Sequence, residues 1–323
     1  MATQDSSAPI DVVILTPDAS FEVPEPVARS AAERGHVFRV VRIPAGPAGV
    51  GLRIGATTAR GDLLAVLDDD DLFEPGKIRW IETVAEEVEK VGYLHNSQSF
   101  VDARNRSLSP LNPHRLVRHP ASLWPEGRSL TVDPHDPALI ARGMSFAPDF
   151  NNSSCVIERT VLLDATPALD RVARGEDSFL FYTALLSGRP MVLTSDRLTR
   201  YRLHSAASTA AEGVTHRDRL AGYVRYADDH VEMIRLVQEQ LAHGSAPEIG
   251  EWLAHELAFW STLRDVATRE VRAHDGRAQV RTLLGAGRVR PRSREVYAGL
   301  WGAWGLVAPR LAREAFLAWR RAW

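Results

Sequence analysis

Four consecutive aspartates follow an apolar run in the stretch Leu64-Ala-Val-Leu-Asp-Asp-Asp-Asp-Leu-Phe-Glu-Pro-Gly-Lys77. The run Leu63–Leu67 has the composition of a buried strand, so we expect Asp68–Asp71 at the carboxyl end of that strand. Crowded carboxylates repel one another, and a hard cation such as Mg²⁺ or Mn²⁺ relieves the repulsion through oxygen ligands. The stretch therefore predicts a cation site at a sheet edge. The alternative is a solvated acidic turn ahead of a helix.

Strands and helices alternate on the amino-terminal side of the aspartates. The sequence predicts strands at Val12–Thr16 and Val37–Ile43, a helix at Val23–Arg34 and a short helix that ends near Gly61. This rhythm is typical of an α/β domain with a mostly parallel sheet covered by helices.

The pattern changes beyond residue 100. Prolines and histidines are frequent in residues 101–149 and no hydrophobic period persists, so we predict an irregular insertion there. The elements expected further on are a strand at Ser154–Ile157, a helix at Asp177–Leu186, a strand from Met191 toward Tyr201–His204, and helices after His216.

Composition limits the class of protein. The 323 residues are 45% hydrophobic and 25% charged, which is typical of a globular protein with a core. A net charge of −2 gives no support for nucleic-acid binding, and the single Cys155 excludes an intramolecular disulfide. The first nine residues lack a secretory signal, and the longest uncharged apolar stretch, Val296–Pro309, is too short to span a membrane. We therefore expect a cytoplasmic protein.

Two further motifs carry polar groups suited to catalysis. Glu176 and Asp177 begin a predicted helix, where the helix dipole keeps a carboxylate ionised and able to accept a proton. In Tyr201-Arg-Leu-His204, strand alternation places Arg202 and His204 on one face, which suits a phosphate and a metal ion. Each motif taken alone is also compatible with a structural role, as a helix cap or a histidine after a strand.

Together these motifs resemble the family 2 glycosyltransferases of GT-A fold. The aspartate segment with Pro75 and Lys77 is similar to the family's Asp-x-Asp-Asp segment and the Pro-x-Lys near it. Gly175-Glu-Asp177 resembles the downstream Glu-Asp pair. The lead-in Gly55, Ala59, Gly61 and Asp62 and the closing Tyr201–His204 with Ser208 complete a resemblance that covers residues 11–209.

The resemblance implies a GT-A-like mixed sheet flanked by helices in a catalytic domain of residues 1–210, followed by a helical extension of residues 211–323. It implies metal-assisted, inverting transfer of a sugar from a nucleotide-sugar donor to a small-molecule, glycan or lipid-linked acceptor, with Mn²⁺ or Mg²⁺ as cofactor. The residues implied are Asp177 as catalytic base, Asp70 and His204 as metal ligands, and Thr16, Asp18, Arg53, Asp68, Asp69 and Arg202 in donor binding. Asp68 is also a candidate metal ligand, and an Asp69/Asp71 register is an alternative.

The sequence departs from the family pattern in two places. Leu52 and Arg53 stand where the family has Arg-Asn. The segment Thr16–Ser20 resembles the nucleoside-binding Asp-Asp-Gly-Ser turn, with Pro17 in place of the first aspartate. In that register almost no chain remains for an earlier strand. In the competing register Val12–Thr16 is the family's first strand and the next strand–helix unit is deleted.

Two other functions are compatible with parts of the sequence. A non-catalytic nucleotide-sugar-binding homologue or partner subunit would explain the departures from the family pattern. An oxidoreductase is suggested by Gly49, Gly51 and Gly55, which resemble a dinucleotide-binding fingerprint, although these glycines begin too late after the strand.

Arginines and tryptophans are frequent near the carboxyl terminus. They are Arg292, Arg294, Trp301, Trp304, Arg310, Arg313, Trp319, Arg320, Arg321 and Trp323. Amphipathic helices of this composition either contact a membrane interface or pack on the catalytic domain or on a second subunit as in a homodimer.

Overall fold

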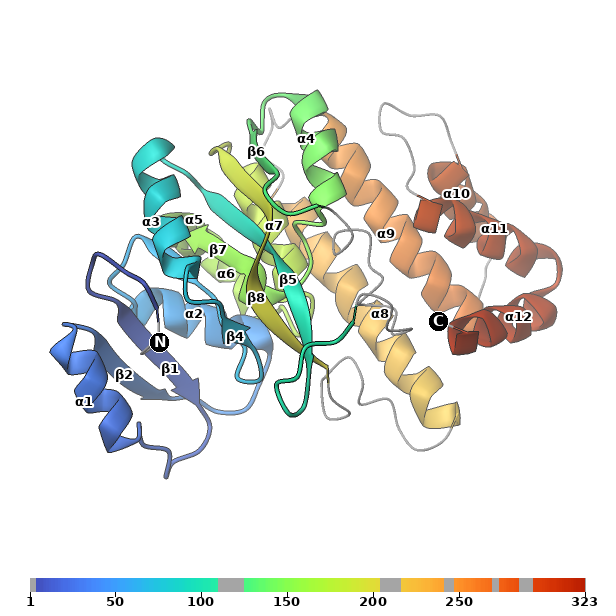
Figure 1. Ribbon diagram of the computed structural model, residues 1–323. Helices are drawn as coiled ribbons and strands as arrows, with labels where there is room; N and C mark the ends of the chain where they lie inside the picture. Colours follow the sequence, from blue (N-terminus) through green and yellow to red (C-terminus); the bar gives the residue numbers. More distant parts are fainter. Residues whose placement is uncertain are drawn as a thin grey trace. The chain divides into compact units, whose positions relative to one another are not determined.

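The computed structural model describes residues 4–109, 125–203, 216–240, 247–268, 273–284 and 293–322 (Figure 1). It divides into two compact units, residues 1–204 and 205–323. The first unit contains all the strands of the described chain, and the second is helical.

Two strand–helix pairs open the first unit. β1 (Asp11–Thr16) and β2 (Val37–Arg42) form a parallel two-stranded sheet, with Asp11 opposite Val37 and Thr16 opposite Arg42. α1 (Glu25–Glu33) connects them, and α2 (Ala48–Thr58) follows β2. These elements confirm the predicted rhythm. α2, the predicted short helix, begins at Ala48 directly after Pro47, whose backbone conformation precedes the first turn.

A six-stranded sheet forms the centre of the unit, in the order β3-β7-β5-β8-β4, with β6 also paired to β8. Its strands are β3 (Leu63–Ala65), β4 (Leu72–Phe73), β5 (Tyr93–Asp102), β6 (Ser129–Val132), β7 (Cys155–Glu158) and β8 (Met191–Leu203). Only β5 and β8 are parallel neighbours (Figure 1). The prediction of a mostly parallel sheet is therefore wrong, since most later strands pair antiparallel and need no crossover helix. The mixed sheet implied by the family resemblance is confirmed.

The insertion is more regular than predicted. β6 alternates buried Leu130 and Val132 with exposed neighbours, and α4 (Pro137–Gly143) is capped by the Asp136 carboxylate. In a strand of only four residues, the alternation of hydrophobic and polar side chains is too short to be recognised from the sequence. Residues 110–124 of the insertion lie outside the described residues.

Helices α3 (Lys77–Glu87), α5 (Arg159–Asp164), α6 (Thr166–Leu169) and α7 (Glu176–Leu186) complete the unit. Residues Phe179–Leu185 of α7 are all buried, so this helix lies within the core, where it contacts β7 and α5. The buried face of α3 packs with Leu94, Val156 and Val192 of the central strands.

Gly49 has a structural role at the start of α2. Its N–H donates to the carbonyl of Val172, and a Cβ at this position would lie 1.9 Å from the carbonyl oxygen of Leu169. Only glycine allows this backbone approach. The glycine that suggested a dinucleotide fingerprint is thus required for helix packing.

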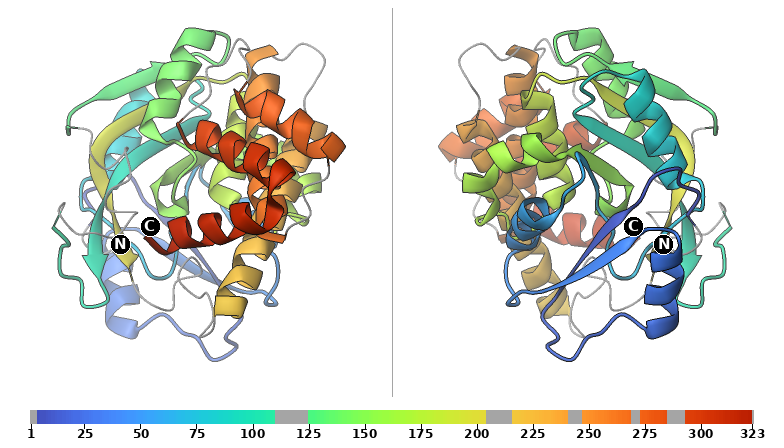
Figure 2. Two further views of the ribbon diagram at one scale, coloured as in Figure 1. Left: turned by 90° about the vertical axis from the view of Figure 1, so that its right-hand side faces the viewer. Right: turned by 90° about the vertical axis from the view of Figure 1, so that its left-hand side faces the viewer.

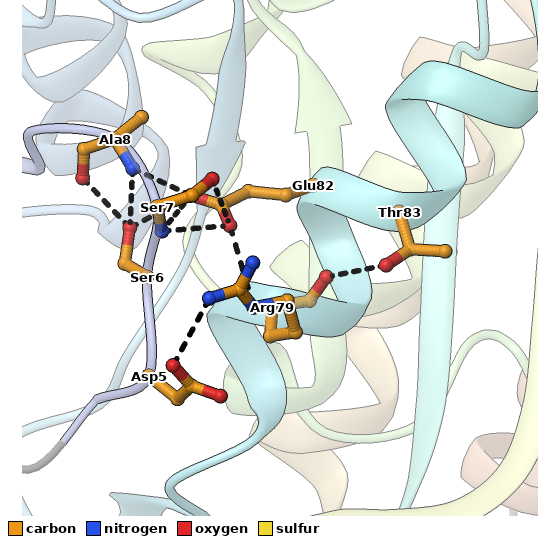
Figure 3. A network of polar contacts seen from close by, with 7 residues as sticks. All are labelled: Asp5, Ser6, Ser7, Ala8, Arg79, Glu82 and Thr83. Atoms are coloured by element: carbon orange, nitrogen blue, oxygen red, sulfur yellow. Dashed lines mark hydrogen bonds and ion pairs between the residues drawn. The ribbon is translucent and has the colours of Figure 1, made fainter.

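The amino-terminal segment is held on α3 by one carboxylate (Figure 3). Glu82 accepts hydrogen bonds from the hydroxyls of Ser6 and Ser7 and from the N–H groups of Ser7 and Ala8, at 2.7–3.2 Å. Arg79 forms an ion pair with Asp5 beside it. Burial acts to raise the pKa of Glu82, but these hydrogen bonds outweigh it and lower the pKa to about 2.

Glu82→Gln should lower the free energy of unfolding by about 1–2 kcal/mol at neutral pH, because an amide accepts weaker hydrogen bonds than a carboxylate. The stabilisation by Glu82 is complete above its unfolded pKa of 4.5 and is lost as the pH falls toward about 2. Urea unfolding at several pH values measures this, with Glu87→Gln on the exposed side of α3 as control. Equal stabilities of the two variants at pH 7 would contradict the prediction.

The second unit consists of α8 (His216–Glu239), α9 (Pro247–Thr268), α10 (Ala273–Leu284), α11 (Ser293–Val307) and α12 (Pro309–Ala322). α9 is the central helix, because it contacts the other four. Its core includes Phe259, Leu263, Leu283 and Phe316. No helix within the described ranges is long and apolar enough to cross a membrane.

Candidate functional site

The four aspartates form a tight turn after β3. The N–H of Asp71 donates to the carbonyl of Asp68 across this turn at 3.3 Å, and β4 begins directly afterwards. Asp69 is exposed, Asp68 and Asp70 are half-buried, and Asp71 is buried. The turn thus presents carboxylates at different depths, with Asp69 furthest into solvent.

Arg202 of β8 holds the turn in place. Its N–H donates to Asp71 Oδ1 at 2.8 Å, and its guanidinium Nε donates to the carbonyl of Asp70 at 2.5 Å. The second carboxylate oxygen of Asp71 is buried and accepts no well-formed hydrogen bond from the described residues. The sequence motifs of the aspartates and of Arg202 are therefore in direct contact in the fold.

The pKa values show how closely the acidic groups gather. Burial, followed by the charges of Glu176, Asp71, Asp70 and Asp177, raises the pKa of Asp68 to about 8. Burial also raises the pKa of Asp71 to about 6, against the lowering effect of the Arg202 hydrogen bond. The aspartate turn and the start of α7 therefore form one carboxylate cluster, and its excess negative charge would favour a cation.

The start of α7 is fixed by hydrogen bonds to its two carboxylates. Asp177 Oδ2 accepts the N–H of Asn151 at 3.0 Å, and its Oδ1 accepts the N–H of Ser178 at 2.8 Å. Asn152 Nδ2 donates to Glu176 Oε1 at 2.9 Å. Burial and the neighbouring Glu176 raise the pKa of Asp177 to about 7. Asp177 is thus a carboxyl that exchanges its proton near neutral pH, as a general base requires.

Ser153 connects the aspartate turn with the segment that holds Asp177. Its hydroxyl accepts the N–H of Asp68 at 3.0 Å. Its carbonyl accepts hydrogen bonds from Lys77 Nζ and from the Thr199 hydroxyl, the latter at 2.9 Å. Asn151, two residues earlier, has a φ of 71°, an unusual conformation for a residue other than glycine. The segment Asn151–Ser154 therefore links both acidic motifs through its backbone.

Lys77 is fully buried next to this segment. Its ammonium group also contacts the Thr199 hydroxyl at 3.2 Å and lies 4.0 Å from the centre of the Phe73 ring. Burial lowers the pKa of Lys77 to about 7, although the nearby Asp71 carboxylate acts to raise it. Lys77 therefore joins Ser153 to Thr199 of β8 through hydrogen bonds within the core.

Three of the predicted donor-binding residues make their hydrogen bonds away from the carboxylate cluster. Thr16 and Asp18 lie in the turn after β1, where the Asp18 N–H donates to the Thr16 hydroxyl at 3.1 Å and Asp18 Oδ1 accepts two hydrogen bonds from Ser20. These Ser20 hydrogen bonds lower the pKa of Asp18. Arg53 on α2 pairs with Asp170 at 2.7 Å. His204 lies outside the described residues.

The sequence analysis missed the polar residues Asn151, Asn152 and Ser153. A signal was present, because Asn-Asn-Ser-Ser stands directly before the buried strand β7, and such residues form turns through side chain to backbone hydrogen bonds. Their partners are distant in sequence and appear only in the fold.

The carboxylates fit a divalent cation that is shared with a ligand. No group of three or more His, Cys, Asp or Glu side chains in the part of the chain that the structure describes converges as a complete metal site. Mg²⁺ and Mn²⁺ commonly use one or two carboxylates together with phosphate oxygens of a substrate. The acidic turn, in which one buried Asp71 oxygen accepts no well-formed hydrogen bond from the described residues, provides such an incomplete set.

Solved structures share this fold. The structure of S. aureus TarS 1-349 in complex with UDP matches with a TM-score of 0.54 and 12% identity, over 98% of this chain and 84% of that chain. The complex of the same protein with UDP-GlcNAc matches with a TM-score of 0.53 and 10% identity, over 99% and 85% of the two chains. At these identities the likeness shows the fold, which is of the GT-A type.

Residues 1–212 match the sequence profile of the family described as glycosyltransferase like family 2. The match covers more than half of the chain, which therefore belongs to this family. A comparison with curated protein sequences gives no match. Membership of this family makes the chain a glycosyltransferase.

Ser153→Ala should lower the free energy of unfolding by about 1–2 kcal/mol, because the Asp68 N–H loses its acceptor at a partly buried position. Ser99→Ala is the matched control, since the Ser99 hydroxyl makes only a 3.5 Å contact with the Thr199 carbonyl. Urea unfolding compares the two variants. A Ser153 variant as stable as the Ser99 variant would show that this hydrogen bond does not fix the turn.

Proposed function

We propose that this protein transfers a sugar from a nucleoside diphosphate sugar to an acceptor hydroxyl by a single, inverting displacement assisted by Mn²⁺ or Mg²⁺. The observation that carries the proposal is the carboxylate cluster. Asp68, Asp70 and Asp71 at a sheet edge share one electrostatic environment with Asp177 at the start of α7. The cluster thus combines groups that hold a cation with a group that accepts a proton.

Asp70 and Asp68 are the proposed cation ligands, with His204 as an additional ligand. The charges of Asp71 and Asp70 contribute to the raised pKa of Asp68, and the charge of Asp70 contributes to the raised pKa of Asp71, whereas Asp69 is exposed. This supports the register Asp68/Asp70 over Asp69/Asp71, and leaves Asp69 for contacts to the donor. When bound, the cation would neutralise the charge that develops on the departing diphosphate.

Asp177 is the proposed catalytic base. Its two oxygens accept backbone N–H groups, which fix the carboxylate in one orientation. Its pKa of about 7 allows it to take the proton of an acceptor hydroxyl as that oxygen attacks the anomeric carbon. Attack from the side opposite the diphosphate inverts the configuration at that carbon.

Arg202 and Arg53 are the proposed phosphate contacts, and Thr16 and Asp18 the proposed contacts of the nucleoside. The assignment of Arg202 is supported by its direct hydrogen bonds to the aspartate turn. Arg53 would have to exchange its ion pair with the half-exposed Asp170 for a phosphate, which costs little at a solvated position. A small-molecule, glycan or lipid-linked acceptor and a cytoplasmic location stay predictions from the sequence.

Asp177→Asn should lower turnover by about 10²–10⁴-fold while donor binding is retained, because the variant lacks a proton acceptor. In the wild-type protein the turnover number should fall as the pH drops through about 7, since protonated Asp177 cannot act as a base. Release of nucleoside diphosphate measures both effects.

Glu176→Gln is the matched control, because it changes the adjacent carboxylate and keeps an acceptor for Asn152. It should retain most of the turnover. Equal losses in the two variants would remove Asp177 from its proposed role. Stabilisation of the wild-type protein by a donor without any release of diphosphate would favour a non-catalytic binder.

Asp70→Ala should abolish the Mn²⁺-dependent part of donor binding, because a cation shared with the diphosphate would lose one of its two carboxylates. A thermal-shift panel of UDP-, GDP-, dTDP- and CMP-sugars, with and without Mn²⁺, first identifies the donor for the wild-type protein. Asp69→Ala is then the comparison variant and should keep the Mn²⁺ effect. The reverse result would move the cation to Asp69 and Asp71.

A further inference from the structure

Five large apolar side chains lie exposed along α11 and the first turn of α12. They are Tyr297, Leu300, Trp304, Val307 and Leu311. The spacing of the first four by three and four residues places them on one face of α11. Val307 is 85% exposed and Leu311 63% exposed. A contiguous apolar row of this kind, unlike scattered exposed residues, marks an interaction surface. We call these five residues the apolar stripe.

α11 lies against α9 and α10 of its own unit (Figure 2). Trp301 packs against the core there, beside small residues of α11. A Cβ at Gly302 would lie 2.8 Å from Thr262 of α9, and one at Gly299 would lie 2.8 Å from Leu284 of α10. Ala298, the neighbour of Gly299 in sequence, is also buried. A surface helix usually places its large apolar residues toward the core. α11 places several of them in solvent, so folding of the unit does not account for the apolar stripe.

The sequence around the apolar stripe is strongly basic. Residues 285–323 contain eight arginines and two glutamates, a net charge of +6, whereas the net charge of the whole chain is −2. The preceding part of the chain must therefore carry −8. Within the described side chains, Arg310 is exposed directly beside Leu311. A charge asymmetry of this size indicates an anionic partner for the carboxyl-terminal segment.

We propose that the apolar stripe docks on an anionic lipid surface. Tyr297 and Trp304 are residue types that prefer the membrane interface, and arginines on the same segment would pair with lipid phosphates. A second copy of the chain is a poorer partner, because a twofold contact would bring two segments of charge +6 together. The helix is also interrupted at Ala308, between α11 and α12, so a straight helix pair between two copies of the chain could involve α11 alone.

Flotation of the full-length protein with lipid vesicles tests the proposal, without donor or metal, so the result does not depend on the proposed catalytic function. Vesicles of phosphatidylcholine alone are compared with vesicles of phosphatidylcholine and phosphatidylglycerol in equal parts. The protein should bind the anionic vesicles, and added salt should weaken binding. The double variant Val307→Asp, Leu311→Asp should bind at least about tenfold more weakly, because it places charge in the apolar stripe.

Val37→Asp is the matched control, because Val37 is also an exposed valine, 52% exposed, at the start of β2 in the other unit. It should leave vesicle binding unchanged, and circular dichroism confirms that all variants are folded. Absence of wild-type binding, or equal binding by the double variant, would overturn the proposal. So would light scattering that shows a wild-type dimer and a monomeric double variant, since the stripe would then be covered by a second copy.

Discussion

Accumulated negative charge is the constraint on which this site depends. Burial raises the pKa values of Asp68, Asp71 and Asp177, and the charges of neighbouring carboxylates raise them further. Such a cluster is unfavourable for folding, and the protein tolerates it by supplying N–H donors from Asn151, Ser178 and Arg202. Donors of this kind orient the carboxylates without neutralising them. The remaining charge is what the proposed cation or a proton would compensate, so the repulsion that lowers the stability of the fold would also favour binding of the cation.

The segment Asn151–Ser154 converts two acidic motifs into one site. The motifs are more than a hundred residues apart in sequence, and their side chains repel, so attraction between them cannot hold them together. Asn151 contacts Asp177, and Ser153 contacts Asp68 and the buried Lys77. The positive φ of Asn151 shows that the backbone accepts a strained conformation to make these contacts. Distance between the proposed base and the proposed cation ligands is therefore set by a short stretch of backbone.

Local sequence patterns predicted those helices and strands that depend mainly on residues close together in the chain. The helices and strands up to β3, and the helix that begins at Glu176, follow from hydrophobic periods and turn residues. The order of the central sheet could not be predicted in this way, because the antiparallel pairing of β7 with β3 and β5 joins residues that are far apart in the sequence. Burial of Lys77 was equally hidden, since lysine is normally exposed and its partners are a carbonyl and a hydroxyl from distant strands. The motif with Arg202 was informative because its register on β8 fixes its contact to the aspartate turn.

The two parts of the sequence also differ in the sign of their net charge. The acidic excess lies before residue 285, in the part that contains the carboxylate cluster, and the basic excess lies in the last 39 residues. An anionic surface would attract the basic part and repel the acidic part, so binding would take place through the carboxyl-terminal segment that carries the apolar stripe. A transferase held in this way meets acceptors confined to the surface at a higher effective concentration than acceptors in solution. Among the predicted acceptor classes, a lipid-linked acceptor is the one that such an arrangement favours.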